Sequence, residues 1–308
     1  MDWVISATVP TTWRTDSMLP SPGERKSWAR GPNGWDFAVH RPYEPGDEIN
    51  TIDWFASAAT GLQEVITRVN FEPRDSRFYV LTDMGSTMGF GSYRTSKRML
   101  AAEVTLSIIL SAKETADRVG FVLYDDFSAV HTQRTRNAQT VFYPAARSIV
   151  EYDEAVLAGE IDPAAAEDKS ITGLQLALDS VEDLSRSLVF VVSDFMNMTE
   201  EDEAMLERVA AVHDVVCIMI QDLRERELPQ GALFGYGFYV FEDMRTGETK
   251  TIWLSPNVRR QFAENFNAHE QKVIELFNRC DCDWEVISTE EGLAAHEKLV
   301  TLLANHQK

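Results

Sequence analysis

One stretch of the chain, residues 78–89, constrains the fold more than any other. It reads Phe-Tyr-Val-Leu-Thr-Asp-Met-Gly-Ser-Thr-Met-Gly, an apolar run that ends at Asp83 and is followed by a small, hydroxyl-rich turn. Such a run predicts a strand that is buried on both faces of a sheet. A broadly apolar helical pattern follows from about residue 94 to residue 116 and predicts a buried helix. Together they predict an α/β fold with Asp83 at the edge of the sheet where such folds bind ligands.

The rest of the chain continues this alternation of strands and helices. Further strands are predicted at residues 119–124, 188–194, 214–220 and 284–287, with a short edge strand at 129–134 and a β-hairpin at 238–254. Helices are predicted at residues 137–150, 172–181, 200–211, 258–277 and 292–304, and a loop at 151–168. Because strands that alternate with helices form parallel sheets with right-handed crossovers, we expect a doubly wound, mostly parallel α/β sheet.

Residues 1–72 differ in composition from the rest of the chain. They contain six of the eleven prolines and five of the seven tryptophans, and they show no sustained helical period. Disordered segments are usually poor in aromatic residues, so we expect an irregular arm that its tryptophans anchor on the main domain. Residues 62–71 carry a partial strand pattern that predicts pairing at the edge of a sheet. This divides the chain into an arm, residues 1–72, and a main domain, residues 73–308.

The charge balance excludes some classes of partner. The chain has 49 acidic and 29 basic residues, which gives a formal net charge of −20. This charge repels phosphate backbones, so we expect no nucleic-acid binding and favour a basic partner, a cationic surface or a metal ion. No apolar run approaches the roughly 18 residues of a membrane helix, and no signal peptide is visible. The three cysteines, an odd number, argue against a disulfide framework, so a cytoplasmic protein is expected.

Three separate segments carry oxygen ligands that are predicted to meet at one edge of the sheet. Asp83 and Thr87 lie in the first turn, Thr172 precedes a second helix, and Asp194 ends a neighbouring strand. Two carboxylates close together cost free energy unless a proton or a cation neutralises them, and oxygen ligands suit Mg²⁺ or Mn²⁺. Asp, Ser and Thr at such junctions also commonly cap helices, so Asp83 and Thr172 can equally be read as caps alone.

These positions resemble the von Willebrand factor type A domain. That family carries a metal-ion-dependent adhesion site written Asp-x-Ser-x-Ser, followed by a distant Thr and a distant Asp, and here Asp83, Thr87, Thr172 and Asp194 match it. Residues 41–57 resemble a more specific group, the domain-of-unknown-function family number fifty-eight, through their Pro-Gly-Asp and Ile-Asp-Trp segments. The resemblance covers about residues 34 to 300. It implies a Rossmann-like von Willebrand factor type A fold.

The upstream motif adds a second group of candidate residues. The resemblance implies that they brace the fold or form a partner surface: Arg41, Tyr43, Asp47, Asp53 and Trp54. Two positions depart from the pattern, because Asn50 and Ala59 stand where family members usually show arginine.

A further departure affects the metal site. Position 85 is glycine where the family has the first serine, so one hydroxyl ligand is missing, while Thr87 keeps the second. Ser86, a backbone carbonyl or a water could fill the gap, and the alternative is a metal-free scaffold of the same fold. Restoring the hydroxyl by Gly85→Ser is expected to tighten binding of the ion.

The resemblance implies a non-enzymatic adaptor that presents a cation to a carboxylate of a protein partner. Proteins of this group accompany MoxR-type AAA+ ATPases, and such pairs are associated with the maturation or remodelling of client proteins, a chaperone-like role. The partners expected from this resemblance are therefore an AAA+ ATPase and its client.

A metal-dependent hydrolase that uses the same acids is the alternative from another functional class. It needs a base and a substrate pocket, and the sequence offers no convincing candidate for either. A hydrolase with Thr87 as a nucleophile between Gly85 and Gly89 is also disfavoured. It needs a histidine in a loop, whereas His213 heads a predicted strand and His269 and His296 fall in predicted helices. The acids at residues 125 and 126 are predicted to be a solvated strand end.

Overall fold

The structure is a computed structural model. It describes residues 28–31, 36–44, 49–59, 65–73, 77–93, 95–115, 117–166, 168–228, 237–243 and 245–305. Within this part of the chain, no helix combines the length and the apolar character that spanning a bilayer requires.

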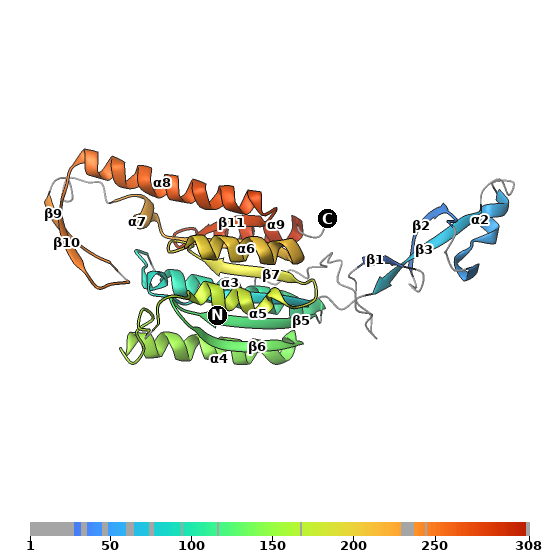
Figure 1. The fold of residues 1–308 in the computed structure, drawn as a ribbon, viewed down its shortest axis with the longest axis horizontal. Coiled ribbons are helices and arrows are strands. Elements are labelled where there is room, and N and C mark those ends of the chain that lie inside the picture. Colours follow the sequence, from blue (N-terminus) through green and yellow to red (C-terminus); the bar gives the residue numbers. More distant parts are fainter. Residues whose placement is uncertain are drawn as a thin grey trace.

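A six-stranded sheet forms the centre of the molecule (Figure 1). Its strand order is β11-β8-β7-β4-β5-β6, in which β6 is antiparallel to β5 and all other neighbours are parallel. The strands are β4 (Arg77–Asp83), β5 (Arg118–Tyr124), β6 (Ala129–Asn137), β7 (Leu188–Ser193), β8 (Asp214–Gln221) and β11 (Asp283–Ser288). The predicted fold class is confirmed: this is a doubly wound, mostly parallel α/β sheet.

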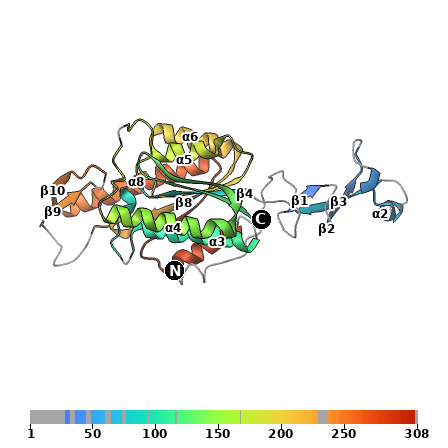
Figure 2. The ribbon, with the colours of Figure 1, turned by 90° about the horizontal axis from the view of Figure 1, so that it is seen from below.

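Helices cover both faces of this sheet (Figure 2). One face packs against α3 (Lys97–Thr115), α4 (Ala138–Leu157) and α9 (Leu293–Asn305). The other face packs against α5 (Gly173–Glu182), α6 (Glu200–Val212) and α8 (Pro256–Arg279). Alternate residues of the central strands enter the two hydrophobic clusters, as Val80 and Leu81 of β4 do. This double burial is why these strands read as continuous apolar runs.

Two of the boundaries that differ from the predicted ones adjoin α4. The helix α4 continues to Leu157, so the first seven residues of the predicted acidic loop are helical. The edge strand β6 runs to Asn137, where the Asn137 side chain accepts the Gln139 amide and caps α4. Caps and tertiary packing, which periodicity does not report, decide both ends.

The strand β4 and the helix α3 position the candidate site. The 3₁₀ helix η2 (Thr87–Gly89) lies in the connection between them. Thr82, at the end of β4, and Thr105, in the middle of α3, share a hydrogen bond of 2.7 Å between their buried hydroxyls. The turn after Asp83 is therefore held between two buried elements.

The predicted hairpin is present at one end of the molecule. It consists of β9 (Gly237–Glu242) and β10 (Thr249–Leu254), paired antiparallel, with Gly247 in the turn at a φ of 67°. The short helix α7 (Leu223–Arg226) follows β8.

A second, smaller sheet precedes the main one. Its strands pair antiparallel in the order β1-β3-β2, and its elements are β1 (Trp28–Gly31), β2 (Asp36–Pro42), η1 (Ile49–Thr51), α2 (Trp54–Ala59) and β3 (Ile66–Pro73). The segment is thus more regular than the sequence indicated. The edge position predicted for residues 62–71 is wrong, because β3 pairs with both other strands.

Figure 1 draws the small sheet beyond the end of the six-stranded sheet. Residues 1–27, which include Trp3 and Trp13, lie outside the described residues. The packing of the 1–72 arm on the main domain through its tryptophans stays a prediction.

Candidate metal site

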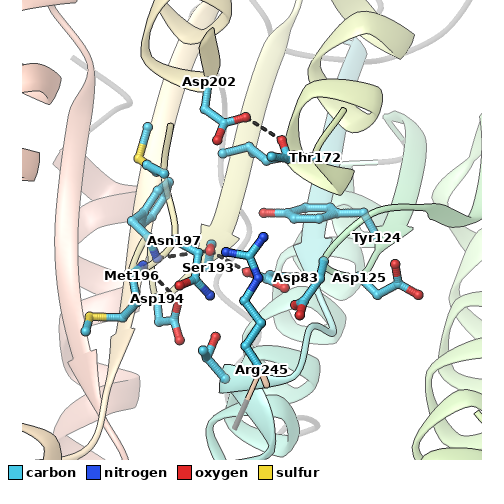
Figure 3. Close-up of a pocket in the computed structure, with 15 residues that line it drawn as sticks. Asp83, Tyr124, Asp125, Thr172, Ser193, Asp194, Met196, Asn197, Asp202 and Arg245 are labelled. Carbon is cyan, nitrogen blue, oxygen red and sulfur yellow. Dashed lines mark hydrogen bonds between the residues drawn. The ribbon is translucent and has the colours of Figure 1, made fainter. Parts of the chain in front are cut away.

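The carboxyl ends of β4, β5 and β7 and the loops around them enclose a small, acidic pocket (Figure 3). Its volume is about 40 Å³, room for a cation with one or two waters. The four residues predicted to hold a metal all line it, and they come from three separate segments: Asp83, Thr87, Thr172 and Asp194. The structure therefore brings together the side chains that the sequence predicts to meet.

Two hydrogen bonds hold the Asp83 carboxylate in the pocket wall. Its Oδ1 accepts the Gly85 amide at 2.8 Å, and its Oδ2 accepts the Ser193 hydroxyl at 2.6 Å. The serine comes from β7, which pairs with β4, so the end of one strand orients the acid on the next. The orientation of this carboxylate is thus built into the sheet.

The surroundings of Asp83 favour its protonated form. Burial, followed by the negative charge of Asp194, raises the pKa of Asp83 to about 7. The hydrogen bonds from Ser193 and Gly85 oppose this shift without cancelling it. A carboxyl group that is half protonated near neutral pH among other acids is one that a divalent cation would stabilise in its charged form.

Asp194 is paired with a buried lysine. The Lys97 ammonium lies 2.6 Å from Asp194 Oδ2 and 2.6 Å from Glu225 Oε1, and the lysine side chain is fully buried. The second oxygen of Asp194 accepts the Met196 amide at 3.0 Å. Burial lowers the pKa of Lys97, but the attraction of the two carboxylates raises it above its usual value, so the ammonium stays charged. Part of the charge of Asp194 is therefore already neutralised.

Thr172 is both a helix cap and a pocket residue. Its hydroxyl accepts the Gln175 amide at 3.1 Å at the start of α5 and donates to the Asp202 carboxylate. The cap interpretation of Thr172 is therefore correct, and its predicted place beside Asp83 is correct as well.

The acidic pair after β5 is part of the site, so the prediction of a solvated strand end is wrong. Asp125 is buried and accepts the amide and the hydroxyl of Ser128. Asp126 lines the pocket and accepts the amide and the hydroxyl of Ser86 at 2.9 and 2.6 Å. The prediction failed because β5 pairs with β4, which places the turn after one strand against the turn after the other. Ser86, predicted as a possible ligand, is among the buried residues and binds Asp126 instead of lining the pocket.

Two further features of the pocket wall are typical of a ligand site. The Tyr124 hydroxyl is buried, and it makes no hydrogen bond of ordinary geometry with any described residue, although Ser193 is near enough to influence its pKa. Phe195 has a φ of 53°, an uncommon value for a bulky side chain, and the His269 ring donates to its carbonyl oxygen at 3.1 Å. An unpaired buried hydroxyl beside an acidic pocket is a donor for a ligand or its water.

The upstream motif lies in the small sheet, where its described members bond locally. Asp53 caps α2, since its Oδ1 accepts the Ala56 amide at 2.9 Å and its Oδ2 lies 3.1 Å from His40 Nε2. The Arg41 side chain donates to a backbone carbonyl, and Trp54 is 61% exposed. The Tyr43 amide donates to the carbonyl of Val65, the residue before β3, and Asp47 lies outside the described residues. Their roles in bracing or partner binding stay predictions.

Arg245 enters the pocket from the tip of the β9–β10 hairpin (Figure 3). The turn is fixed by Asp243, whose carboxylate accepts the Arg245 and Thr246 amides at 2.9 and 3.1 Å. The guanidinium lies 4.9 Å from the centre of the Phe127 ring. Burial raises the pKa of Asp126, and Arg245 is close enough to oppose that shift. A positive charge thus stands within electrostatic range of any metal in the pocket.

Removing this charge is expected to tighten cation binding. In the Arg245→Gln variant, the loss of repulsion between the guanidinium and a divalent cation should lower the Mn²⁺ dissociation constant by about three- to tenfold. Titration calorimetry measures the change. Lys250→Gln, which removes an exposed charge of the same hairpin outside the pocket, is the matched control. Equal affinities in the two variants would contradict this expectation.

Sequence reasoning missed Asp126 and Arg245 in the pocket lining and Lys97 behind it, where it contacts Asp194. A lysine at the start of the apolar pattern of α3 was an available signal for Lys97, because a charge on a buried helix needs a partner. Asp126 follows a strand predicted to lie in the same sheet, so its position was inferable once the strand order was known. The place of Arg245 in the pocket could not be predicted, because no local sequence pattern indicates where the tip of the hairpin packs.

Comparison with solved structures finds similar chains of low sequence identity. The conserved hypothetical protein BatB from Bacteroides thetaiotaomicron is 12% identical, with a TM-score of 0.43, and 74% of this chain and 98% of that chain are covered. A von Willebrand factor type A protein from Catenulispora acidiphila is 13% identical, with a TM-score of 0.38 and coverages of 78% and 44%.

Sequence comparisons give the family. An uncharacterised protein of Mycobacterium tuberculosis is 25% identical over 242 residues, which are 78% of this chain and 70% of that protein. The family model described as "Protein of unknown function DUF58" matches residues 39–272. The family resemblance drawn from the Pro-Gly-Asp and Ile-Asp-Trp segments is confirmed. This chain belongs to the DUF58 family.

Proposed function

We propose that this protein is a non-enzymatic interaction module that binds Mg²⁺ or Mn²⁺ in the pocket and, at the ion, a carboxylate of a protein partner. The observation that carries the proposal is the convergence of Asp83 and Asp194, from two different strands, on one small pocket. The ion would supply an open coordination position for the carboxylate. Asp83, Thr87 and Thr172 would hold it, with Asp194 acting through water.

The donor set of the pocket fits this role. Carboxylate and hydroxyl oxygens are the ligands that Mg²⁺ and Mn²⁺ prefer. The described residues contain no group of three acids, histidines or cysteines that could hold a metal by themselves, so the hydroxyls of Thr87 and Thr172 have to complete the set. Among the described residues lining the pocket there is no histidine or cysteine, which fits Mg²⁺ better than Zn²⁺.

The family resemblance implies the class of partner. It implies that members of this group accompany MoxR-type AAA+ ATPases, and we propose that this chain links such an ATPase to a client protein during maturation or remodelling. The exposed mouth of the pocket would receive an acidic side chain of the ATPase or the client. The Tyr124 hydroxyl and Arg245 are the donors beside the ion that would orient such a carboxylate.

A single hydroxyl substitution tests the function with little risk to the fold. Thr87→Val keeps the shape of the side chain but removes an oxygen from the pocket, so it should weaken Mn²⁺ binding by about tenfold and reduce the Mg²⁺-dependent rise of the melting temperature. Retention of the protein on an immobilised, purified MoxR-type ATPase should require Mg²⁺, and both EDTA and Thr87→Val should reduce it.

The control is Thr95→Val, which changes a threonine of the same connection outside the pocket lining. It should leave both the melting response and the retention unchanged. Retention that persists in EDTA at the level seen with Mg²⁺ would mean that the ion plays no part in partner binding. No melting response to millimolar Mg²⁺ or Mn²⁺ would favour a metal-free scaffold of the same fold.

A further inference from the structure

The glycine at position 85 is required by space and not by backbone conformation. Gly85 is absent from the described glycines with positive φ, so its backbone accepts any residue. A Cβ at this position, however, would lie 2.4 Å from Asp126 Oδ1 and 2.9 Å from Asp83 Oδ1. Both distances are far below an ordinary contact between carbon and oxygen. The carboxylate of Asp126 therefore stands where the side chain of a serine at position 85 would begin.

Asp126 is held in this place by the turn that it faces. The Ser86 amide donates to its Oδ1 at 2.9 Å, and the Ser86 hydroxyl donates to its Oδ2 at 2.6 Å. The strand pairing explains the approach, since Asp83 at the end of β4 is opposite Tyr124 at the end of β5. The contact joins residues 40 positions apart in the chain, so it is a feature of the folded sheet and not of the local turn.

The carboxylate of Asp126 also belongs to the pocket. It lines the same cavity as Asp83 and Asp194. The buried Tyr124 hydroxyl, without a hydrogen-bond partner among the described residues, lies in the same wall. The carboxylates gathered in this lining favour a bound cation, and the Tyr124 hydroxyl is a donor for a ligand or a water beside it.

We propose that Asp126 replaces the hydroxyl ligand that position 85 lacks, so that the turn after β5 supplies an oxygen to a divalent cation bound by Asp83. The inference rests on the proposed metal-binding function and names a ligand that the adhesion-site motif does not contain. A charged oxygen takes the place of a neutral one. The site is therefore altered rather than merely weakened by the loss of the serine.

This inference reverses the effect expected from Gly85→Ser alone. The new side chain would collide with the carboxylates of Asp126 and Asp83, so the single substitution should weaken Mn²⁺ binding instead of tightening it. Serine at position 85 becomes acceptable only when Asp126 is shortened. The two positions should therefore compensate for each other.

A double-mutant cycle tests the exchange. Gly85→Ser and Asp126→Ala should each raise the Mn²⁺ dissociation constant by about tenfold, and the double variant should return to within about threefold of the wild type. In EDTA, Gly85→Ser should lower the melting temperature, and adding Asp126→Ala should recover it. Asp126→Asn, which keeps one oxygen in place, should lose less Mn²⁺ affinity than Asp126→Ala. Asp179→Ala, an exposed acid of α5, controls for the loss of one negative charge.

The outcomes separate this inference from the function on which it rests. If Asp126→Ala binds Mn²⁺ like the wild type while Asp83→Asn does not bind it, the metal site stands and the role of Asp126 is refuted. The double variant also tests whether the two side chains compete for one space. If the effects of Gly85→Ser and Asp126→Ala simply add, both in the melting temperature in EDTA and in the Mn²⁺ dissociation constant, this competition is refuted. If the wild type binds no Mn²⁺, the function and the inference fall together.

Discussion

Asp83→Asn is expected to make the metal-free protein more stable at about pH 8 and to abolish its response to Mg²⁺. The pKa of Asp83 is about 7 in the folded protein, against an ordinary value of 3.8. Between these two values the folded state binds a proton that the unfolded state has released, so stability falls as the pH rises through this window. Asp83→Asn removes the group that binds this proton, so the variant should not lose stability over this pH range.

The expected size of the stability gain follows from the pKa shift of Asp83. One pKa unit corresponds to about 1.4 kcal/mol, and because Asp83 is partly accessible we expect a gain of about 1–3 kcal/mol at about pH 8 and little difference at about pH 4. Denaturant unfolding in EDTA at both pH values measures it. With Mg²⁺ the wild type should become more stable than the Asp83→Asn variant, since only the wild type gains stability by binding the ion. A wild type whose stability does not depend on pH between 4 and 8 would contradict the argument.

Lys97→Met is expected to cause the largest loss of stability of any substitution near the pocket. The lysine is fully buried between Asp194 and Glu225, at 2.6 Å from each carboxylate. Its removal leaves two partly or wholly buried acids without a positive partner, which typically costs about 3–5 kcal/mol. For a chain of this size, such a loss lowers the melting temperature by roughly 6–15 °C.

The matched control is Lys113→Met, which changes an exposed lysine in the last turn of the same helix. It should change the melting temperature by no more than about 2 °C. Mg²⁺ should restore part of the stability lost in Lys97→Met, because the ion takes over the neutralisation of Asp194. A Lys97→Met protein that melts like the control would show that the buried ion pair contributes nothing.

The fold could be predicted because its central strands are buried on both sides. The runs that became β4, β5, β7 and β8 are mostly apolar, a pattern typical of strands in a sheet that helices cover on both faces. The N-terminal segment was harder, because its short antiparallel strands contain few continuous apolar runs. The structure of β1, β2 and β3 depends on pairing between residues distant in sequence, which local patterns do not report.

The candidate site could be predicted only in part, for a physical reason. Asp83, Thr172 and Asp194 follow strands or precede helices, and the carboxyl ends of parallel strands meet by construction. Asp126 was misjudged because an acidic pair at a strand end is usually solvated, and only the β4–β5 register places it against the neighbouring turn. Lys97 was not predicted because the apolar positions of α3 indicate that the helix is buried, but not which acids its buried charges, Lys97 and Arg98, contact.

The central claim is that acids from two strands share one divalent cation, and anomalous diffraction from crystals grown with millimolar Mn²⁺ tests it most directly. We expect a single strong peak in the pocket, within bonding distance of Asp83 and of a threonine hydroxyl from position 87 or 172, and linked to Asp194 through one water. A pocket that holds only water at saturating Mn²⁺, with the Ser193 hydroxyl still bonded to Asp83, would contradict the account.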